Sequence, residues 1–428
     1  MNTGKDKGFA ARLGPGLITG AADDDPSGIA TYSQAGAQFR FSLVWTLFLT
    51  WPLMIGTQML SARIGWVTQQ GLATNIGRVC PRWLTVALIA LLVAANTINI
   101  AADIAAMAGA LRLLVRGIEP LYAIGFGALC IGTQLYFSYE STVRILKWLT
   151  LALFAYVAVI LVVQVPWHRA VAESLRPWAF FPAGVSTTMY ASTVVAVFGT
   201  TISPYLFFWQ ASQEVEDARR SGDSSELRLH PTYVAEHLSR IKQDTWFGMT
   251  FSNLIALCIV IATAVTLNEH GITDIQSSAQ AAEALRPVAG EFAFFVFALG
   301  IIGTGLLAVP VLAGSAAYAV SELFGWKSGL SRGFQDAKGF YLIIIAATGI
   351  GTALSVLDID PMKALVWSAI VNGVISVPIL VVLMLIGQSE RLMGRYTISN
   401  RHRFFGWAAT IVMAIAVAVM LVTTFMPG

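Results

Sequence analysis

Charge is what this sequence has least of. Only 12% of its 428 residues are Asp, Glu, Lys or Arg, whereas 56% are hydrophobic, and the mean hydropathy is +0.69. Soluble domains carry about 25% charged residues. The scarcity of charge therefore excludes an ordinary soluble protein and predicts a chain that crosses a membrane several times.

Cysteine and enzyme motifs are scarce as well. The three cysteines, Cys80, Cys130 and Cys258, are odd in number and widely spaced, with neither a CxxC pair nor a metal-ligand spacing. Cys130 and Cys258 lie in apolar runs, so we expect them to be small packing residues. The sequence has no HExxH, P-loop or nucleophile motif, which argues against an enzyme. The N-terminal "MNTGKDKGFAARLG" lacks a signal-peptide pattern, and we expect the first apolar segment to be retained.

Apolar runs long enough to span a bilayer, about 20 residues each, occur eleven times along the chain. No soluble domain fits between them. The longest hydrophilic connection, 211–243, is charged, and we expect a short amphipathic helix around "PTYVAEHLSR". The runs are 13–37, 41–66, 84–111, 119–138, 145–165, 180–210, 244–267, 291–323, 339–357, 363–387 and 404–426.

Basic residues set the expected orientation. If the N-terminus is cytoplasmic, 20 of the 27 Lys and Arg residues fall in cytoplasmic connections and 7 in external ones. Cytoplasmic loops of membrane proteins carry an excess of Lys and Arg. We therefore expect a multi-pass protein of the cell (inner) membrane with a cytoplasmic N-terminus. The external residues are Arg40, Arg112, Arg116, Arg169, Arg176, Arg286 and Lys363.

The first apolar segment is interrupted by "GAADDDPSGIA", residues 20–30. Pro26 cannot donate a backbone hydrogen bond and disfavours helix at Asp25, and Gly28 adds freedom. We expect two half-helices joined by a short extended piece. Non-helical backbone survives at membrane depth only when it is buried in protein or faces a watery cavity. Freed carbonyl oxygens beside a carboxylate make a hard-oxygen site for a cation.

The sixth segment, "VVAVFGTTISPYLFFWQ", carries a matching interruption at Gly199 and Pro204, with hydroxyl residues between them. Paired breaks at corresponding positions in two halves indicate an inverted-repeat transporter with its site at the midplane. A simple proline kink is the alternative, but the aspartates on the paired segment favour the functional interpretation. The whole chain, 1–428, would be a single transmembrane domain made of repeat one at 13–165, repeat two at 180–387 and an extra helix at 404–426.

These residues resemble a known family. "GPGLITGAADDDPSGIATYSQAGA" is similar to the first segment of the Nramp divalent-metal transporters, whose signature is Asp-Pro-Gly-Asn between a GPG start and a QAGA-like end. The resemblance runs through all eleven segments. It implies an all-α LeuT-like fold with a 5+5 inverted repeat and with helices 1 and 6 broken. It also implies divalent metal ions and the lipid bilayer as partners, no nucleic acid, no bound cofactor, a monomer and no enzymatic activity.

The resemblance assigns individual roles around the two breaks. The family's metal-binding Asp matches Asp25, and its upstream carbonyl ligand falls near Thr200. The Asn that coordinates metal in the family falls on Gly28, so that side-chain ligand is missing. The family's Met-Pro-His motif falls on Ser203 and the two residues after it, so the soft thioether has become a hydroxyl and the His has become Tyr205.

Further departures affect the family's proton route. Its Asp on the third segment is kept as Asp103, but the Glu that follows falls on Ala106, and a second His of segment six falls on Gln210. On segment ten the family's Gln falls on Ala369, and a new polar residue, Asn372, stands one turn away. We expect weak or absent proton coupling, with Asp103 as a remnant proton or electrostatic group. The histidines all lie in the predicted connections: His168, His230, His237, His270 and His402.

The losses indicate which metal the site suits. Thioether favours soft transition metals, whereas carboxylate, carbonyl and water suit Mg²⁺, Ca²⁺ and Mn²⁺. A roomier oxygen-only site suits Mg²⁺, which keeps several waters when protein-bound. This pattern is similar to the Nramp-related magnesium transporters. The candidate metal site comprises Asp25, Thr200, Ser203, Gly28, Asp24 and Asn372.

The two extra aspartates have no counterpart in the ordinary family motif. Three consecutive helical residues point about 100° apart and cannot all face one ion. We expect Asp25 to be the direct ligand, while Asp24 and Asp23 line the vestibule or bind water around the ion. Alternatively, Asp23 bonds backbone donors freed at the break.

The sequence thus predicts a secondary transporter that imports Mg²⁺, and also Mn²⁺, by alternating access. One alternative is a proton-coupled Mn²⁺/Fe²⁺ importer of ordinary Nramp type that uses Asp25 or Asp103 as proton acceptor. Another is a Na⁺-coupled organic-solute symporter, although three adjacent aspartates would repel a substrate carboxylate. A channel is a further possibility, but paired broken helices favour alternating access.

Overall fold

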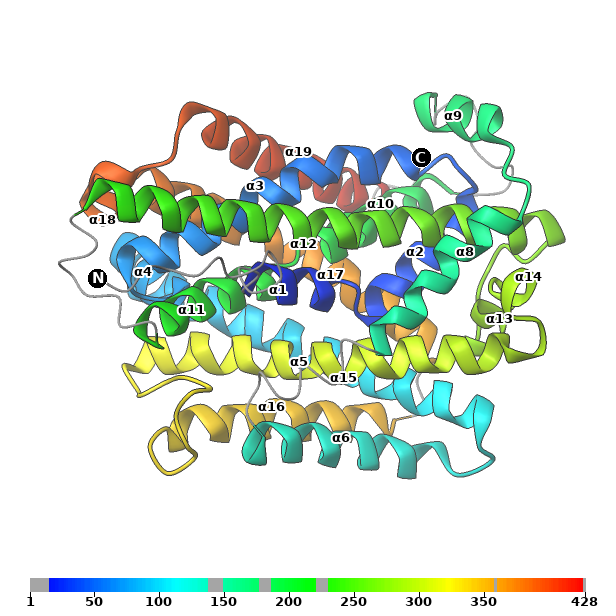
Figure 1. Cartoon of the computed structure of the whole chain (residues 1–428), viewed down its shortest axis with the longest axis horizontal. Helices are drawn as coiled ribbons and strands as arrows, with labels where there is room; N and C mark the ends of the chain where they lie inside the picture. Colours follow the sequence, from blue (N-terminus) through cyan, green and yellow to red (C-terminus); the bar gives the residue numbers. More distant parts are fainter. Residues whose placement is uncertain (1–14, 138–148, 177–185, 221–229, 358–359, 426–428) are drawn as a thin grey trace, which may run out of the picture.

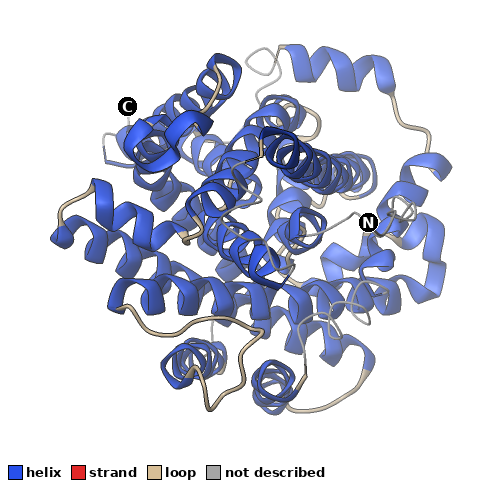
Figure 2. Cartoon of the chain, turned by 60° about the vertical axis from the view of Figure 1, so that its left-hand side comes forward, coloured by secondary structure: helices blue, strands red, loops and turns tan. Residues whose placement is uncertain are grey.

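The computed structural model describes residues 15–137, 149–176, 186–220, 230–357 and 360–425, and all regular elements in these ranges are helices (Figures 1 and 2). This confirms the predicted all-α class. The first half holds α1 (Pro15–Asp23), α2 (Pro26–Phe39), α3 (Val44–Thr68), α4 (Leu72–Val79), α5 (Arg82–Leu114), α6 (Glu119–Tyr136), η2 (Leu149–Leu153), α8 (Phe154–Val162) and α9 (Trp167–Leu175). The second half holds α10 (Thr187–Thr201), α11 (Pro204–Arg220), α12 (Pro231–Thr266), η5 (Asn268–His270), α13 (Ser278–Glu283), α14 (Arg286–Ala289), η6 (Gly290–Phe292), α15 (Ala293–Phe324), α16 (Lys338–Ser355), α17 (Pro361–Gln388), α18 (Glu390–Met393), η7 (Gly394–Tyr396) and α19 (Asn400–Phe425).

Helices occupy all eleven predicted apolar segments within the described ranges. Seven helical stretches are long and apolar enough to cross a membrane by length and composition, and they include α5, α10 with α11, α12, and α15 to α19 apart from the short α18. Counting Leu151–Val162 with Trp167–Leu175, bent by 109°, gives up to eight. The helices at the remaining predicted segments, α1 with α2, α3 and α6, are shorter or less apolar. The protein is therefore a multi-pass membrane protein, and the repeat boundaries 13–165 and 180–387 stay predictions.

Five predicted segments reach beyond the described residues. Residues 13–14, 138, 145–148, 180–185 and 426 of these segments lie outside the part that the structure describes. The described part of the fifth segment consists of η2 and α8, and the chain then turns sharply into α9, which lies at the edge of the bundle (Figure 1).

The charged connection 211–243 differs from the sequence prediction. No separate amphipathic helix forms around "PTYVAEHLSR", because these residues are the first turns of the spanning helix α12. Ion pairs join this extension to α11: the guanidinium of Arg240 lies 2.8 Å from Glu214 Oε2 and 3.2 Å from Asp217 Oδ2. The prediction separated one long helix into two because the residues change from polar to apolar along it.

The predicted break in the first segment is confirmed, since α1 ends at Asp23 and α2 begins at Pro26. Asp25 is extended, with φ −67° and ψ 169°, as expected for a residue before proline. Its side chain accepts a hydrogen bond from the Gly28 N–H and so caps α2. Pro26 stands at the first helical position, where a backbone N–H would have no partner in the helix and where proline has none. The local sequence thus both ends α1 and starts α2.

The predicted break in the sixth segment is confirmed as well. Ile202 ends α10 with a non-helical φ of −120° and ψ of 61°, and α11 starts at Pro204. Ser203 Oγ lies 2.8 Å from two carbonyl oxygens in the last turn of α10, and Ser376 Oγ of α17 lies 2.7 Å from the Ile202 carbonyl oxygen. Carbonyl groups freed at the end of a helix are thus satisfied where water is scarce.

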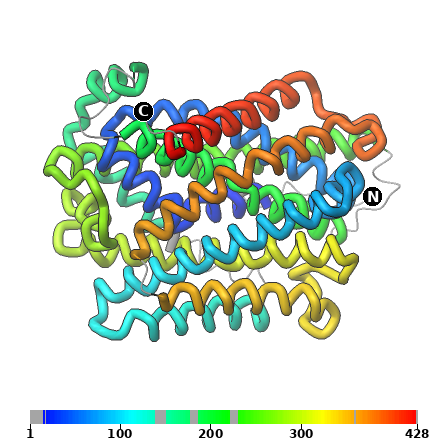
Figure 3. The backbone as a smooth tube through the Cα atoms, turned by 180° about the vertical axis from the view of Figure 1, so that it is seen from behind, coloured from blue at the N-terminus to red at the C-terminus, as the bar shows by residue number. Residues whose placement is uncertain are grey.

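The two halves of the first broken helix, α1 and α2, lie in the centre of the bundle. α1 packs against α12, α11 and α15, and α2 packs against α12, α17 and α10. In Figure 1 these dark blue helices lie between the green α12 and the yellow α15. Figure 3 shows the opposite side, where α17 runs beside α5 and α19. The backbone without helical hydrogen bonds is therefore enclosed by protein, as membrane depth requires.

Two of the central helix crossings depend on glycine. A Cβ on Gly20 of α1 would lie 2.4 Å from the backbone of Gly248 in α12. A Cβ on Gly199 of α10 would lie 2.1 Å from the Ala369 carbonyl oxygen and 2.5 Å from the Gly373 nitrogen, both in α17. Real Cβ atoms essentially never come within 3.0 Å of such atoms. Small residues of this kind let helix backbones approach closely in membranes.

We expect Gly199→Ala to destabilise the protein, because the methyl group has to push α10 away from α17. Overpacking costs about 1–3 kcal/mol. The measurement is the thermal unfolding midpoint of the detergent-solubilised protein. Gly349→Ala in α16 is the matched control, since a Cβ there meets nothing within 4 Å. Equal midpoints for the two variants would contradict the close crossing.

Candidate functional site

The two breaks meet in space. The Tyr205 hydroxyl at the start of α11 lies 3.2 Å from the Ala22 carbonyl oxygen in α1 and 3.3 Å from Asp25 Oδ2. On the other side, a Cβ on Gly28 of α2 would lie 3.0 Å from Thr200 Oγ1 of α10. The sequence placed both breaks at one site, and the structure brings them together there.

Asp25 is the best-connected carboxylate of the site. It is buried, and it accepts hydrogen bonds from the Gly28 N–H at 2.7 Å, Ser27 Oγ at 2.6 Å, Asn99 Nδ2 at 3.1 Å and the Tyr205 hydroxyl at 3.3 Å. Hydrogen bonds to an ionised acceptor are roughly twice as strong as neutral ones. These donors come from α2, α5 and α11, so the position of the Asp25 carboxylate is fixed by three helices.

Asn99 is a site residue that the sequence analysis missed. Its Oδ1 accepts a hydrogen bond from Ser368 Oγ of α17 at 2.6 Å, while its Nδ2 donates to Asp25. The contact with Asp25 assigns the amide orientation, because an ionised carboxylate only accepts and therefore faces the amide nitrogen. Asn99 stands four residues before Asp103, so both lie on one face of α5. That spacing of polar residues in an apolar segment is the signal that would have found it.

Asp23 and Asp24 face a different helix. Ser252 Oγ of α12 lies 2.6 Å from Asp23 Oδ2 and 3.1 Å from Asp24 Oδ1, and both carboxylates are buried. Asp23 Oδ1 has no hydrogen-bond partner among the described residues. Asp24, one of the predicted ligands, therefore shares a hydroxyl with Asp23 on the α12 side, whereas Asp25 faces α5 and α11. No pattern in the sequence pointed to Ser252 as a site residue.

The predicted ligands on the second-half helices are placed around the end of α10. The Ser203 hydroxyl bonds to the carbonyl oxygens of Gly199 and Thr200, so the expected carbonyl ligand at Thr200 already has one partner. A carbonyl has a second lone pair for an ion. Ser376 links the end of α10 to the Asn372 carbonyl oxygen at 2.8 Å. Asn372 Oδ1 is buried and has no hydrogen-bond partner in the described chain, so this amide oxygen is available as a ligand.

Asp103 is buried in α5, and neither of its carboxylate oxygens has a hydrogen-bond partner within the described residues. It is close enough to Asp25 and to the Ser27 N–H to interact with both electrostatically. A buried charge is costly unless it is paired or binds a cation. None of the described ion pairs involves Asp103 or the three aspartates at the break.

These four carboxylates do not by themselves complete a metal shell. The described residues contain no group of three or more His, Cys, Asp and Glu side chains arranged to hold a metal ion. The remaining ligands of a bound cation would be hydroxyl and carbonyl oxygens and water, which are the ligands of hard cations.

The position of Gly28 is tighter than the sequence analysis expected. A Cβ there would lie 3.0 Å from Thr200 Oγ1, 3.2 Å from the Asp23 carbonyl oxygen and 3.4 Å from Tyr32 Cε2. In this conformation, neighbouring side chains therefore occupy the space that the missing Asn would fill. A larger residue at position 28 would therefore require Thr200 or Tyr32 to shift.

Four histidines predicted in connections lie in helices instead, His168 in α9, His237 in α12, His270 in η5 and His402 in α19. His237 is in the extension of α12 and stacks on Trp66 with ring centroids 4.9 Å apart, and His402 is in the first turn of α19. At Gln210, where the family has a His, the amide accepts from Gln58 Nε2 at 2.6 Å and donates to Thr245 Oγ1 at 2.9 Å. A neutral amide holds these helices together but does not titrate at neutral pH.

Comparisons with known proteins agree with this geometry. The family model described as "Natural resistance-associated macrophage protein-like", Nramp, matches residues 16–423. The divalent metal cation transporter MntH of Aeromonas hydrophila is 26% identical, over 90% of this chain and 88% of its own length. The protein of the same name from Klebsiella pneumoniae is 25% identical, over 94% and 92%.

Solved structures show the same fold. A manganese transporter of Eremococcus coleocola matches with a TM-score of 0.74 at 17% identity, covering 99% of this chain and 90% of that one. Mhp1, a nucleobase-cation-symport-1 family transporter, matches with a TM-score of 0.53 at 13% identity, covering 96% and 93%. These matches confirm the LeuT-like architecture with two broken helices that the sequence predicted. Because the family model covers almost the whole sequence, the chain belongs to the Nramp family.

Proposed function

We propose that the protein is a secondary transporter that imports divalent metal cations, Mg²⁺ and also Mn²⁺, by alternating access. The observation that carries this proposal is the set of four buried carboxylates, Asp23, Asp24, Asp25 and Asp103, at the meeting point of two broken helices without a described ion-pair partner. Such a site attracts a cation and is costly to keep empty of positive charge.

The relatives support a divalent metal as the cargo. The Aeromonas and Klebsiella relatives are named divalent metal cation transporters, and the Eremococcus protein is named a manganese transporter. Members of the Nramp family are membrane transporters, so the expectation that the chain is no enzyme is confirmed. The metal is cargo, and no cofactor is needed. We further propose a monomer in the cell (inner) membrane with a cytoplasmic N-terminus, on the distribution of Lys and Arg.

The preference for Mg²⁺ rests on the chemistry of the donors. Asp25, Thr200, Ser203 and Asn372 offer carboxylate, carbonyl, hydroxyl and amide oxygens, and Ser203 stands where the family has a thioether. Oxygen ligands suit Mg²⁺ and Mn²⁺ and do not select for softer metals. Because the shell is incomplete without water, it suits an ion that keeps part of its hydration.

One observation favours the alternative of an ordinary Mn²⁺/Fe²⁺ importer. A Cβ on Gly305 of α15 would lie 2.7 Å from Met107 Sδ and 3.3 Å from Pro26 Cγ, so a thioether does lie near the first break. Met107 stands one turn after Asp103 on α5. The likeness to Mhp1 extends to the fold of an organic-solute symporter, but the aspartates at the break would repel a substrate carboxylate.

Weak or absent proton coupling follows from the groups around the aspartates. The described hydrogen bonds of Asp23, Asp24 and Asp25 involve hydroxyl, amide and backbone groups, and no histidine. Gln210 and Tyr205 occupy the two histidine positions of the family, and Ala106 occupies the glutamate position. Asp103 is then a single carboxylate without a neighbouring relay on its own helix.

We expect Asp25→Asn to reduce divalent-cation uptake into proteoliposomes to the level of empty liposomes while the protein stays folded. The amide keeps the size of the side chain but removes the charge at the break. The matched control is Asp23→Asn, which removes an equally buried charge on the α12 side and should retain part of the uptake. Full uptake by Asp25→Asn would refute the assignment of the direct ligand.

Restoring the family's ligands should change selectivity. The double variant Gly28→Asn with Ser203→Met introduces an amide and a thioether, so we expect Mg²⁺ uptake to fall relative to Mn²⁺ and Cd²⁺. The comparison is competitive uptake of the three ions. Gly28→Ala with Ser203→Ala controls for the crowding at Gly28 without adding a soft ligand. An unchanged Mg²⁺ to Mn²⁺ ratio in the first variant would show that these positions do not set selectivity.

We expect Mg²⁺ or Mn²⁺ to enter liposomes down its own gradient without acidifying the interior. The membrane potential alone supplies about 2.3 kcal/mol per charge per 100 mV, roughly twice that for a dication. Uptake and internal pH are followed together with a pH-sensitive dye. Stoichiometric acidification that disappears in Asp103→Asn would identify Asp103 as a proton relay and favour the ordinary importer.

A further inference from the structure

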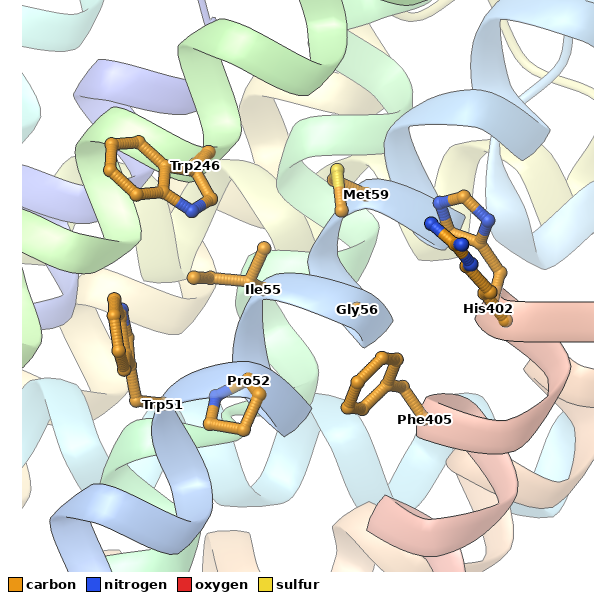
Figure 4. Close-up of a pocket in the computed structure, with 9 residues that line it drawn as sticks. Trp51, Pro52, Ile55, Gly56, Met59, Trp246, His402 and Phe405 are labelled. Atoms are coloured by element: carbon orange, nitrogen blue, oxygen red, sulfur yellow. The ribbon is translucent and has the colours of Figure 1, made fainter.

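An apolar groove lies between α3, α12 and α19, away from the aspartates (Figure 4). Its volume is about 260 Å³. Figure 4 shows α3 as its floor, Trp246 of α12 on one side, and Phe405 and His402 of α19 on the other. The lining residues are Trp51, Pro52, Ile55, Gly56, Met59, Trp246, Arg401, His402 and Phe405.

The groove opens onto the outer surface of the bundle. Trp246 is 48% exposed and Phe405 is 36% exposed, and the neighbouring Phe404 and Ile411 of α19 are 69% and 54% exposed. Exposed apolar surface of this extent marks contact with a membrane. Gly56 deepens the groove, because even a Cβ there would lie 3.1 Å from Phe405 Cβ. The walls therefore suit an acyl chain.

One end of the groove is basic. Arg401 and His402 line it, and Arg63 and Lys242 are close enough to His402 to act on its ring electrostatically. Within the described chain, no ion pair involves any of these four residues. The group carries several positive charges beside an apolar groove, a combination that fits a phosphate headgroup with its acyl chains.

The basic end is held in shape by the turn before α19. The guanidinium of Arg63 donates to the carbonyl oxygens of Tyr396 and Thr397, each at 3.1 Å. Ser399 Oγ and His402 Nδ1 form a hydrogen bond of 2.8 Å. Lys242 and Arg401 remain exposed and free to reach a headgroup. The side chains of Arg63 and His402 are thus held in place by hydrogen bonds, whereas those of Lys242 and Arg401 can adjust to a headgroup.

We propose that this groove binds an anionic phospholipid, with an acyl chain along α3 between Trp246 and Phe405 and the phosphate at Arg401 and Lys242. Basic pockets between membrane helices bind anionic headgroups. A zwitterionic lipid would gain less from the positive charges of Arg63, Lys242 and Arg401, and a free phosphate ion would gain nothing from the apolar walls. None of the lining residues belongs to the candidate metal site, so the test of this proposal does not depend on the proposed transport function.

The test is native mass spectrometry of the purified full-length chain with phosphatidylglycerol or phosphatidylcholine of identical acyl chains. We expect bound phosphatidylglycerol on the wild type, and roughly tenfold or more weaker binding for Arg401→Gln with Lys242→Gln. The matched control, Arg403→Gln with Arg332→Gln, also removes two exposed positive charges but leaves the groove intact, and should bind as the wild type does. Arg401→Lys keeps the charge and should retain the lipid.

Three outcomes would overturn the proposal. They are equal binding of phosphatidylcholine, retention of phosphatidylglycerol by the Arg401 and Lys242 double variant, and equal losses in the double variant and its control. Met59→Trp fills the groove and so tests whether the acyl chain binds in it. Undiminished lipid binding by this variant would contradict an acyl chain bound along α3. The last measurement is competition between the bound lipid and inorganic phosphate. Full displacement of the lipid by millimolar phosphate would show an anion site only.

Discussion

The constraint on which this structure depends is that freed backbone groups inside a membrane must find partners. Two helices are cut at the centre of the bundle, and each cut releases carbonyl and N–H groups that lipid cannot satisfy. The partners are supplied locally and by neighbours: Asp25 caps α2, Tyr205 reaches the Ala22 carbonyl oxygen, and hydroxyl groups cover the end of α10. The same groups form the cation site, so the site is a consequence of how the breaks are stabilised.

The aspartates at the site are not equivalent. Asp25 is surrounded by donors from three helices, so its charge is largely solvated by the protein itself. Asp23 and Asp24 share the single hydroxyl of Ser252, and the Asp103 carboxylate has no hydrogen-bond partner among the described residues. A cation that binds at Asp25 therefore also offsets the negative charge of Asp23, Asp24 and Asp103, for which the protein supplies few hydrogen-bond donors. This arrangement gives the ion one firm anchor and a surrounding that favours its positive charge.

The breaks could be predicted from the sequence because their causes are local. Proline and glycine act on their own residues and nearest neighbours, so Pro26 and Pro204 mark the helix starts directly. Asn99, Ser252 and Ser368 were missed because their roles depend on which helices pack together, which a single apolar segment does not reveal. The extension of α12 was misread for a related reason: hydropathy marks where the polar residues begin, whereas a helix supported by the ion pairs of Arg240 continues past that point.

The length of α12 has a mechanical consequence. With 36 residues at 1.5 Å each it is roughly 54 Å long, well beyond the thickness of a bilayer core. Both halves of the first broken helix pack against α12. Gly20 of α1 contacts it closely, and the Gly16 N–H donates a hydrogen bond to Asp244 Oδ2 at 2.7 Å. Gly36 of α2 packs against Val260. Only Asp24 and Asp25 lie between the halves. A movement of α1 against α12 would be accommodated at these two residues. It would have to break the Gly16–Asp244 and Ser252–Asp23 hydrogen bonds and separate Gly20 from Gly248, whereas the contact of α2 with α12 at Gly36 would remain.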